Sequence, residues 1–389
     1  METKATRKKT ATSGFWQQGK VDVVFACLVG IILLIGLLML FSASYAYSLT
    51  YFGDSYRFIL RQGLFALVGI GLMKLFSSIN YHFWRKFAWV IYGISVALLA
   101  ILLIMPPMIE GVEYKRWFVI GSFSFQPSEI AKFSIILLFS HLIAKNYNKM
   151  KTFKFGILKL GALLLIVCIL VVVETHLSAT ILIFSIGVVL MIVGGVKFKY
   201  IGIGIGGGVA LAATAILTGV VSYGSSRIQY WLDPWADATG KGYQTIQSLL
   251  AIGSGGLLGR GIGQSRQKYL WVPEPHNDFI FSIVCEELGF IGAVIIILLF
   301  CALVWRGFTI AMNAPDKFGS LLAVGLTFQV GIQMVLNILV VTNTIPNTGI
   351  SLPFFSYGGT ANFFFMISVG MILSVSRTGR KRKTVKLVV

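Results

Sequence analysis

The stretch Trp271-Val-Pro-Glu-Pro-His-Asn-Asp-Phe-Ile-Phe281, with the apolar run that it opens, decides the fold of this chain. The run extends from about residue 279 to residue 304, which is long enough to cross a bilayer as a helix. It contains Glu286 and Glu287, and four polar residues lie just before it: Glu274, His276, Asn277 and Asp278. Carboxylates at a membrane boundary are costly to desolvate, so this stretch is a candidate functional site.

The composition predicts a polytopic membrane protein. Of the 389 residues, 56% are hydrophobic and only 12% are charged, and the mean hydropathy is +0.83. Soluble domains of this size are less apolar. Because a backbone in lipid must satisfy its own hydrogen bonds, we predict an all-α fold with about ten transmembrane helices. The candidate spans are 21–43, 58–76, 87–106, 128–144, 157–174, 177–195, 200–221, 279–304, 318–341 and 358–375.

The distribution of charge predicts the orientation of the chain. A net charge of +19 would suggest nucleic acid binding only if the positions of the charges were ignored. With ten spans and a cytoplasmic N-terminus, 23 of the 33 basic residues fall in cytoplasmic segments, as the positive-inside rule requires. Of the 14 acidic residues, 11 fall on the other side. We therefore predict that both termini are cytoplasmic, that no nucleic acid is bound, and that carboxylate chemistry belongs to the outer face.

The chain divides into a membrane domain and two tails. Residues 1–20 and 377–389 are basic tails that carry the charge needed to bind anionic membrane lipids. Residues 21–376 form the ten-helix domain, in which the outer loop 222–278 joins the seventh and eighth spans. A connection of this length is too long to be passive. Within it, Ile246–Ile252 predicts a short amphipathic helix at the outer interface, followed by a flexible glycine-rich turn over 253–263.

Gln126-Pro-Ser-Glu129 precedes the fourth span, in the other sizeable outer loop. A structural explanation is available, since Pro127 suits a first helical turn and Glu129 complements the helix dipole. Lys132, three residues further on, can pair with Glu129. A functional explanation is that a charged pair at or below the outer membrane surface is rarely placed there for stability alone.

Lys115-Arg116-Trp117 lies in the same outer loop. Trp117 can serve as an interfacial aromatic with solvated charges beside it. Alternatively, Arg116 offers phosphate a bidentate fork. Lys268 and several other basic residues of the long loop also lie on the outer face, against the topological trend, which favours an anionic ligand there.

Asp278 also has two interpretations. It can cap the helix that begins near residue 279, because Asp is a favoured N-cap. A cap does not require the Pro273-Glu-Pro-His276 segment before it, however, or Glu286 two turns further on. On a regular helix Glu286 would lie roughly 12 Å deeper than Asp278, so the two carboxylates can share a cavity without touching.

The last outer loop, 347–359, is rich in helix-breaking residues and includes Ser356. Such backbone is tolerated at membrane depth where it lines a cavity, although an ordinary turn is the alternative. The four histidines share no metal-ligating spacing, so no metal site formed by the protein is predicted. The four cysteines fall inside spans, without a disulfide framework.

Taken together, these segments resemble the SEDS family (shape, elongation, division and sporulation), which comprises FtsW, RodA and SpoVE. The similarity covers nearly the whole chain. It is carried by Lys115–Gly121, Phe125–Lys132, Leu232–Trp235, Gly242–Ser248, Gly253–Gly256, Pro273-Glu274, His276, Asp278–Phe281, Glu286–Gly289, Leu352–Phe354 and Ser356–Gly359.

The resemblance implies a peptidoglycan glycosyltransferase that polymerises lipid II on the outer face of the bacterial cytoplasmic membrane. It implies a class B penicillin-binding protein as partner, alongside other divisome proteins. Asp278 matches the essential aspartate of the family, and we expect it to be the general base. No cofactor is implied, although the sequence leaves open whether a divalent cation accompanies the pyrophosphate. The expected substrate-binding residues are Arg116, Trp117, Gln126, Glu129, Lys132, Lys268, Glu274, His276, Glu286 and Ser356.

Glu174-Thr-His-Leu-Ser178 stands where RodA-like members have a Pro-Asp-Leu-Gly type of sequence, which favours the FtsW/SpoVE branch and hence division or sporulation. Two rival functions remain open: a flippase for lipid-linked precursors, and a non-catalytic division scaffold. A flippase would depend on charges across the membrane depth, whereas an enzyme would depend on the outer loops.

Overall fold

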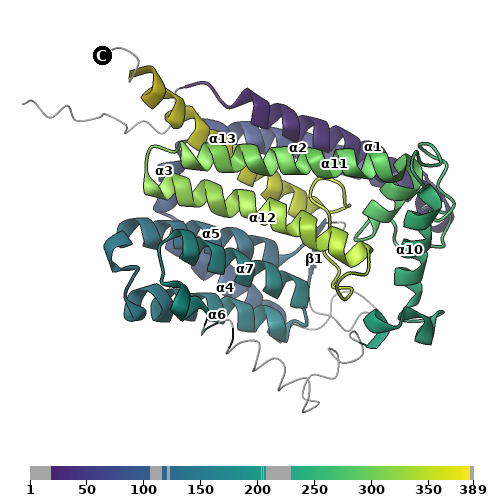
Figure 1. Ribbon diagram of the computed structural model, residues 1–389, viewed down its shortest axis with the longest axis horizontal. Helices are drawn as coiled ribbons and strands as arrows, with labels where there is room; N and C mark the ends of the chain where they lie inside the picture. Colours follow the sequence, from purple (N-terminus) through teal and green to yellow (C-terminus); the bar gives the residue numbers. More distant parts are fainter. Residues whose placement is uncertain are drawn as a thin grey trace, which may run out of the picture.

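The computed structural model describes residues 19–105, 116–120, 123–202, 204, 206 and 229–385. Long apolar helices lie side by side in a bundle (Figure 1). They are α1 (Val23–Phe52), α2 (Arg57–Ser78), α4 (Ala88–Ile104), α5 (Pro127–Lys145), α6 (Leu160–Val173), α7 (Leu177–Val193), α11 (Ile280–Met312), α12 (Lys317–Val341) and α13 (Gly359–Val385). The shorter elements are α3 (Tyr81–Arg85), β1 (Phe118–Ile120), β2 (Phe123–Phe125), η1 (Tyr147–Lys149), η2 (Phe153–Lys159), η3 (Pro234–Asp237) and α10 (Tyr243–Gly255).

The described helices confirm the prediction of an all-α, multi-pass membrane protein. Seven are long and apolar enough to span a bilayer, with η2 and α6 counted together, and α4 and α7 are shorter apolar helices. These nine correspond to nine of the ten predicted spans. The remaining one, 200–221, falls almost entirely outside the described residues.

Several helices run past the predicted ends of their spans. The prediction ended the first span at residue 43, but α1 continues to Phe52 and stops at Gly53, whose φ is 71°. The extra turns are stabilised by aromatic side chains one turn apart, since the Tyr47 and Tyr51 ring centroids lie 4.5 Å apart. Hydropathy detects apolar length and therefore misses helical turns that are held by such local contacts.

The two described ends of the chain meet at one end of the bundle. The backbone N–H of Asp22 donates to Ser376 Oγ at 3.0 Å, and Arg377 Nη1 donates to the Gly19 carbonyl at the same distance. The amphipathic helix predicted around Ile246–Ile252 is present as α10, and it crosses the bundle at the opposite end (Figure 1).

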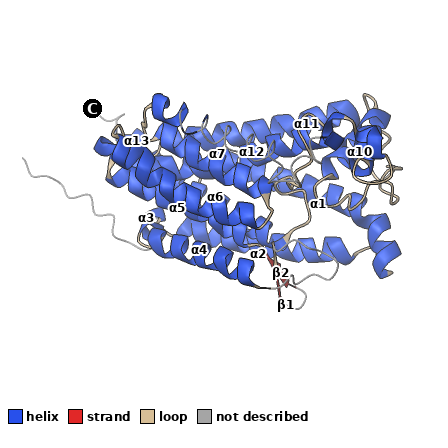
Figure 2. Cartoon of the chain, turned by 90° about the horizontal axis from the view of Figure 1, so that it is seen from below, coloured by secondary structure: helices blue, strands red, loops and turns tan. Residues whose placement is uncertain are grey.

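The centre of the bundle is formed by α5 and α12, which contact each other and α7. The helices α2 and α13 pack closely through small residues. A β-carbon at Gly370 would lie 2.6 Å from the Met73 carbonyl oxygen, and one at Gly69 would lie 2.8 Å from the Met366 side chain. The two strands form an antiparallel hairpin in which Phe118 pairs with Phe125, just before α5 (Figure 2).

The helix α11 is interrupted at Gly289, which has a φ of 68°. The N–H groups of Phe290 and Ile291 donate to carbonyls of the loop after α10, at 2.9 and 3.1 Å. The carbonyls of Glu286 and Glu287 in turn accept from N–H groups of that loop at 3.0 Å. The described part of the long loop before α11 is therefore inserted into the start of that helix, and it satisfies the backbone groups that the break exposes.

The segment between α12 and α13 re-enters the bundle. Phe354 and Phe355 are each 1% exposed, and Phe354 has a φ of 65°. A β-carbon at Gly36, near the middle of α1, would collide with the Phe354 carbonyl. The prediction of irregular backbone at membrane depth is thus confirmed, and the alternative of an ordinary turn is wrong.

Candidate active site

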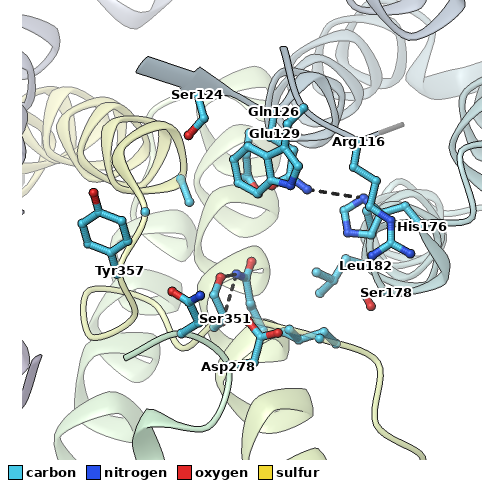
Figure 3. Close-up of a pocket in the computed structure, with 18 of the residues that line it drawn as sticks. Arg116, Ser124, Gln126, Glu129, His176, Ser178, Leu182, Asp278, Ser351 and Tyr357 are labelled. Carbon is cyan, nitrogen blue, oxygen red and sulfur yellow. Dashed lines mark hydrogen bonds between the residues drawn. The ribbon is translucent and has the colours of Figure 1, made fainter. Parts of the chain in front are cut away.

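A cavity of about 450 Å³ lies among the β1–β2 hairpin, α5, α7, α12, the turn before α11 and the re-entrant loop. Arg116 and His176 lie across it from Tyr357, with Asp278 and Ser351 between them (Figure 3). Its lining brings together seven of the eleven residues that the sequence nominated: Arg116, Trp117, Gln126, Glu129, Lys132, Glu274 and Asp278. These residues come from two segments that are far apart in the chain, 116–132 and 274–278.

Asp278 lies in the turn that precedes α11 and is partly buried in the cavity wall. The N-cap of α11 is Phe279, and among the described residues no side chain caps this helix, so the interpretation of Asp278 as a helix cap is wrong. Burial raises the pKa of Asp278 to about 6; the Glu274 carboxylate adds to this rise, and Arg116 opposes it. A carboxyl group with such a pKa is suited to accept a proton near neutral pH.

Glu274 is held in a strained backbone conformation close to this carboxylate. Its φ is 45°, although it precedes Pro275, and residues before proline favour extended backbone. Asn277 fixes the arrangement, because its Nδ2 donates to Glu274 Oε2 at 2.9 Å and its backbone N–H donates to the Glu274 carbonyl at 3.0 Å. Non-glycine residues in such conformations persist where the surroundings impose them, often at functional sites.

The positive charge of the cavity comes from Arg116 and Lys132. Arg116 Nη2 donates to the carbonyl of Thr175 in the turn between α6 and α7, which aims the guanidinium at the cavity. Lys132 Nζ donates to Glu129 Oε1 at 2.7 Å and to Gln333 Oε1 at 3.4 Å. Cationic side chains such as Arg116 and Lys132 can hold an anionic ligand opposite the Asp278 carboxylate.

The cavity also contains residues that the sequence did not nominate, among them His176, Ser178, Gln333, Ser351 and Tyr357. His176 Nδ1 lies 3.5 Å from Gln126 Nε2. Its position follows from the Glu174–Ser178 turn, which brings the start of α7 against α5. The unusual sequence of that turn was visible, but no spacing in it linked residue 176 to residue 126.

Glu286 and Lys268 lie outside the lining of this cavity, in a second polar cluster where the long loop before α11 meets that helix. The Glu286 carboxylate accepts from Ser265 Oγ and from the N–H groups of Arg266 and Gln267. The Lys268 ammonium pairs with Glu287 at 3.0 Å, and Glu287 also accepts from Ser42 Oγ of α1 at 2.6 Å. This cluster fastens the long loop before α11 to α1 and α11.

His276 and Ser356 also lie outside the cavity lining, and they contact the lining residues Tyr357 and Asn277. The His276 ring packs between Tyr47 and Phe58, with centroid distances of 4.9 and 4.2 Å, and burial lowers its pKa to about 4. Ser356 Oγ donates to the Asn277 carbonyl at 2.8 Å and accepts from the Leu352 N–H at 2.7 Å. Both residues thus connect the turn that carries Asp278 to the re-entrant loop and the neighbouring helices.

Comparison with known proteins identifies relatives over almost the full length of the chain. Residues 22–381 match the model of the FtsW/RodA/SpoVE family, described as cell cycle proteins. Stage V sporulation protein E of Bacillus subtilis (strain 168) is 38% identical over 363 residues, which cover 92% of this chain and 98% of that protein. A probable peptidoglycan glycosyltransferase FtsW of Geobacter sp. (strain M18) is 36% identical over 91% of this chain and 96% of its own.

Two solved structures share the fold. One is a chain of a peptidoglycan synthase complex that coordinates polymerization and crosslinking, with a TM-score of 0.76 and 27% identity over 92% of this chain and 98% of that one. The other is the rod shape determining protein RodA of Thermus thermophilus, with a TM-score of 0.68 and 26% identity over 92% of this chain and 97% of that one. The agreement of sequence, fold and length shows that the chain belongs to the FtsW/RodA/SpoVE family.

Proposed function

We propose that this protein is a peptidoglycan glycosyltransferase that polymerises lipid II, acting in cell division or sporulation. The observation that carries the proposal is the cavity that joins a carboxylate of raised pKa, Asp278, to the guanidinium of Arg116. Relatives named as probable peptidoglycan glycosyltransferases support the same reaction class.

The proposed reaction is a single inverting displacement. The 4-hydroxyl oxygen of the acceptor attacks the anomeric carbon of an α-linked donor. The bond between that carbon and the pyrophosphate oxygen breaks, and a β-1,4 linkage forms. Asp278 takes the proton from the attacking hydroxyl. Because the pKa of Asp278 is raised to about 6, its carboxylate is mostly ionised at neutral pH while remaining a stronger base than an ordinary aspartate.

The departing pyrophosphate needs positive charge opposite the base. Arg116 is suited to this task, since a guanidinium offers a planar fork to phosphate oxygens. Lys132 shares its charge with Glu129, and the ammonium of Lys268 is engaged by Glu287. In this proposal Trp117, Gln126 and Glu129 contact substrate from the cavity wall. Glu286 and Lys268, together with His276 and Ser356, support the walls rather than touch substrate.

The protein is a multi-pass membrane protein, and its orientation follows from the proposal. The cavity would open on the outer face of the cytoplasmic membrane, with residues 21–376 as the membrane domain and both tails in the cytoplasm. A class B penicillin-binding protein is the proposed partner, since a relative of known structure belongs to a peptidoglycan synthase complex that coordinates polymerization and crosslinking. Other divisome proteins would join this complex during division.

The test is a polymerisation assay with purified full-length protein, with and without a class B penicillin-binding protein, and with lipid II as substrate. Glycan products are separated by size. Polymer ladders that form with the wild-type protein but not with an Asp278 variant support the glycosyltransferase function. Absence of polymer under both conditions, together with transport of fluorescent lipid II across proteoliposomes, would favour the flippase instead. Absence of both activities would leave the scaffold function.

A further inference from the structure

Two amide side chains of α12, Gln333 and Asn337, lie one turn apart on the same face of the helix. They are 2% and 0% exposed, in the last third of an apolar span. Polar side chains are costly in such a place, and they usually face the interior of the bundle for a specific purpose. Both amides point at backbone of the proposed active site.

Asn337 bridges the turn that carries Asp278 and the re-entrant loop. Its Nδ2 lies 2.7 Å from the Asp278 carbonyl oxygen and 2.6 Å from the Ile350 carbonyl oxygen. A primary amide nitrogen carries two hydrogens, so both donors are used. The two carbonyls also fix the orientation of the amide, because its oxygen at that place would face two acceptors.

Gln333 extends the same connection towards the charged wall. Its Nε2 donates to the Ser351 carbonyl at 3.1 Å and lies 3.2 Å from Ser351 Oγ, while its Oε1 accepts from Lys132. The re-entrant loop is therefore held at two successive residues, 350 and 351, by two successive turns of α12.

This attachment determines how near the loop approaches the proposed base. A β-carbon on Gly349, one residue before Ile350, would lie 3.1 Å from Asp278 Oδ2. Ser356 and Tyr357 tie the Asp278 turn to the far end of the loop, through the carbonyls of Asn277 and His276. At Asp278 itself and at Ile350, next to Gly349, the link is made by Asn337.

We infer that Asn337 is a positioning residue, which holds the backbone of Asp278 and the re-entrant loop at the spacing that the transfer reaction requires. This inference rests on the proposed glycosyltransferase function. Asn337 does not touch the substrate, so it acts on the chemical step through Asp278. A displacement of about 1 Å in a reacting group can lower a rate roughly 100-fold.

The experiment compares Asn337→Leu and Asn337→Ser with Gln329→Leu as matched control. Gln329 is a buried amide two turns before Asn337 on the same helix, and its amide atoms have no hydrogen-bond partner within the described residues. Leu cannot donate, and Ser has one donor and cannot bridge two carbonyls. For both Asn337 variants we expect kcat to fall about 10- to 100-fold while KM for lipid II stays within about twofold. The acid limb of the kcat–pH profile should also move, and the control should change none of these.

Hydrogen–deuterium exchange of the purified proteins gives a measurement that does not require activity. Exchange at residues 276–280 and 348–352 should quicken in both Asn337 variants but not in the control. Wild-type kcat in Asn337→Ser at equal protein level, or unchanged exchange in these segments, overturns the inference. If the wild-type protein makes no polymer, the proposed function fails, whereas an active wild type with fully active Asn337 variants removes only the role of Asn337.

Discussion

The Nζ atom of Lys132 lies 2.7 Å from Oε1 of Glu129, and this ion pair is buried in the cavity wall, with exposures of 2% and 5%. Glu129 lies in the first turn of α5, where it also complements the helix dipole. Its second oxygen, Oε2, has no hydrogen-bond partner within the described chain. The geometry therefore allows both a structural pair and a group that receives a ligand, and mutagenesis can separate them.

A double mutant distinguishes these two roles. Removing either charge alone leaves the other buried and unpaired, which should cost about 3–5 kcal/mol of stability. Glu129→Gln with Lys132→Met should recover most of that stability. If both residues contact substrate, polymerisation should remain as low in the double variant as in the worse single one. Recovery of both stability and polymerisation would return the pair to a purely structural role.

Asp278→Asn should abolish most polymerisation. A general base contributes roughly 10²–10⁴-fold in rate, and the amide keeps the shape of the side chain. Because Asp278 caps no helix, the variant should fold, insert and bind its partner normally. Asp278→Glu should retain a trace of activity. Initial rates on lipid II at equal protein level are the measurement, and near wild-type turnover by Asp278→Asn would remove this residue from the mechanism.

The pH dependence of kcat should report the environment of Asp278. A base must be deprotonated, so kcat should fall as the pH drops through about 6, where an ordinary aspartate would lose activity only near pH 4. Glu274→Gln removes a neighbouring negative charge that raises the pKa of Asp278, so it should move this limb to lower pH. Replacing Arg116 with Gln should move the limb to higher pH. A Glu274→Gln profile identical to that of the wild type would contradict the electrostatic coupling.

The second polar cluster should matter for stability rather than for substrate binding. Lys268→Met leaves the Glu287 carboxylate buried at 1% exposure without its cation, which should destabilise the protein by about 3–5 kcal/mol. We expect a lower unfolding temperature and an unchanged KM for lipid II. A rise in KM at normal stability would instead support a direct substrate contact by Lys268, as the sequence predicted.

The orientation of the chain can be tested with introduced cysteines. Thr239 is exposed and lies four residues before α10, and Asn148 is exposed in η1, directly after α5. In a background without Cys27, Cys168, Cys285 and Cys301, Thr239→Cys should react with an impermeant thiol reagent on intact cells, and Asn148→Cys only after permeabilisation. Labelling of both from outside would rule out the ten-span orientation.

Hydropathy, charge and local motifs were sufficient to predict the class of fold. The apolar runs predicted nine of the described helices, because desolvation acts on any stretch of sufficient length wherever it lies in the chain. The same analysis selected Arg116, Glu129, Lys132 and Asp278, because charged residues near a membrane surface are unusual without a reason.

Only the tertiary structure decided which of these residues meet. Glu286 and Lys268 are charged residues near a predicted membrane boundary, as Glu274 is. The loop before α11 docks into the break of that helix at Gly289, and Glu286 and Lys268 therefore lie in a separate cluster. Asn337 gave no signal, and the atypical sequence around His176 did not indicate its partner. Their roles depend on contacts with Gln126 and with the backbone of Asp278 and Ile350. The physical reason is that burial and periodicity are properties of one segment, whereas a hydrogen bond between α12 and a distant turn exists only once packing has fixed both.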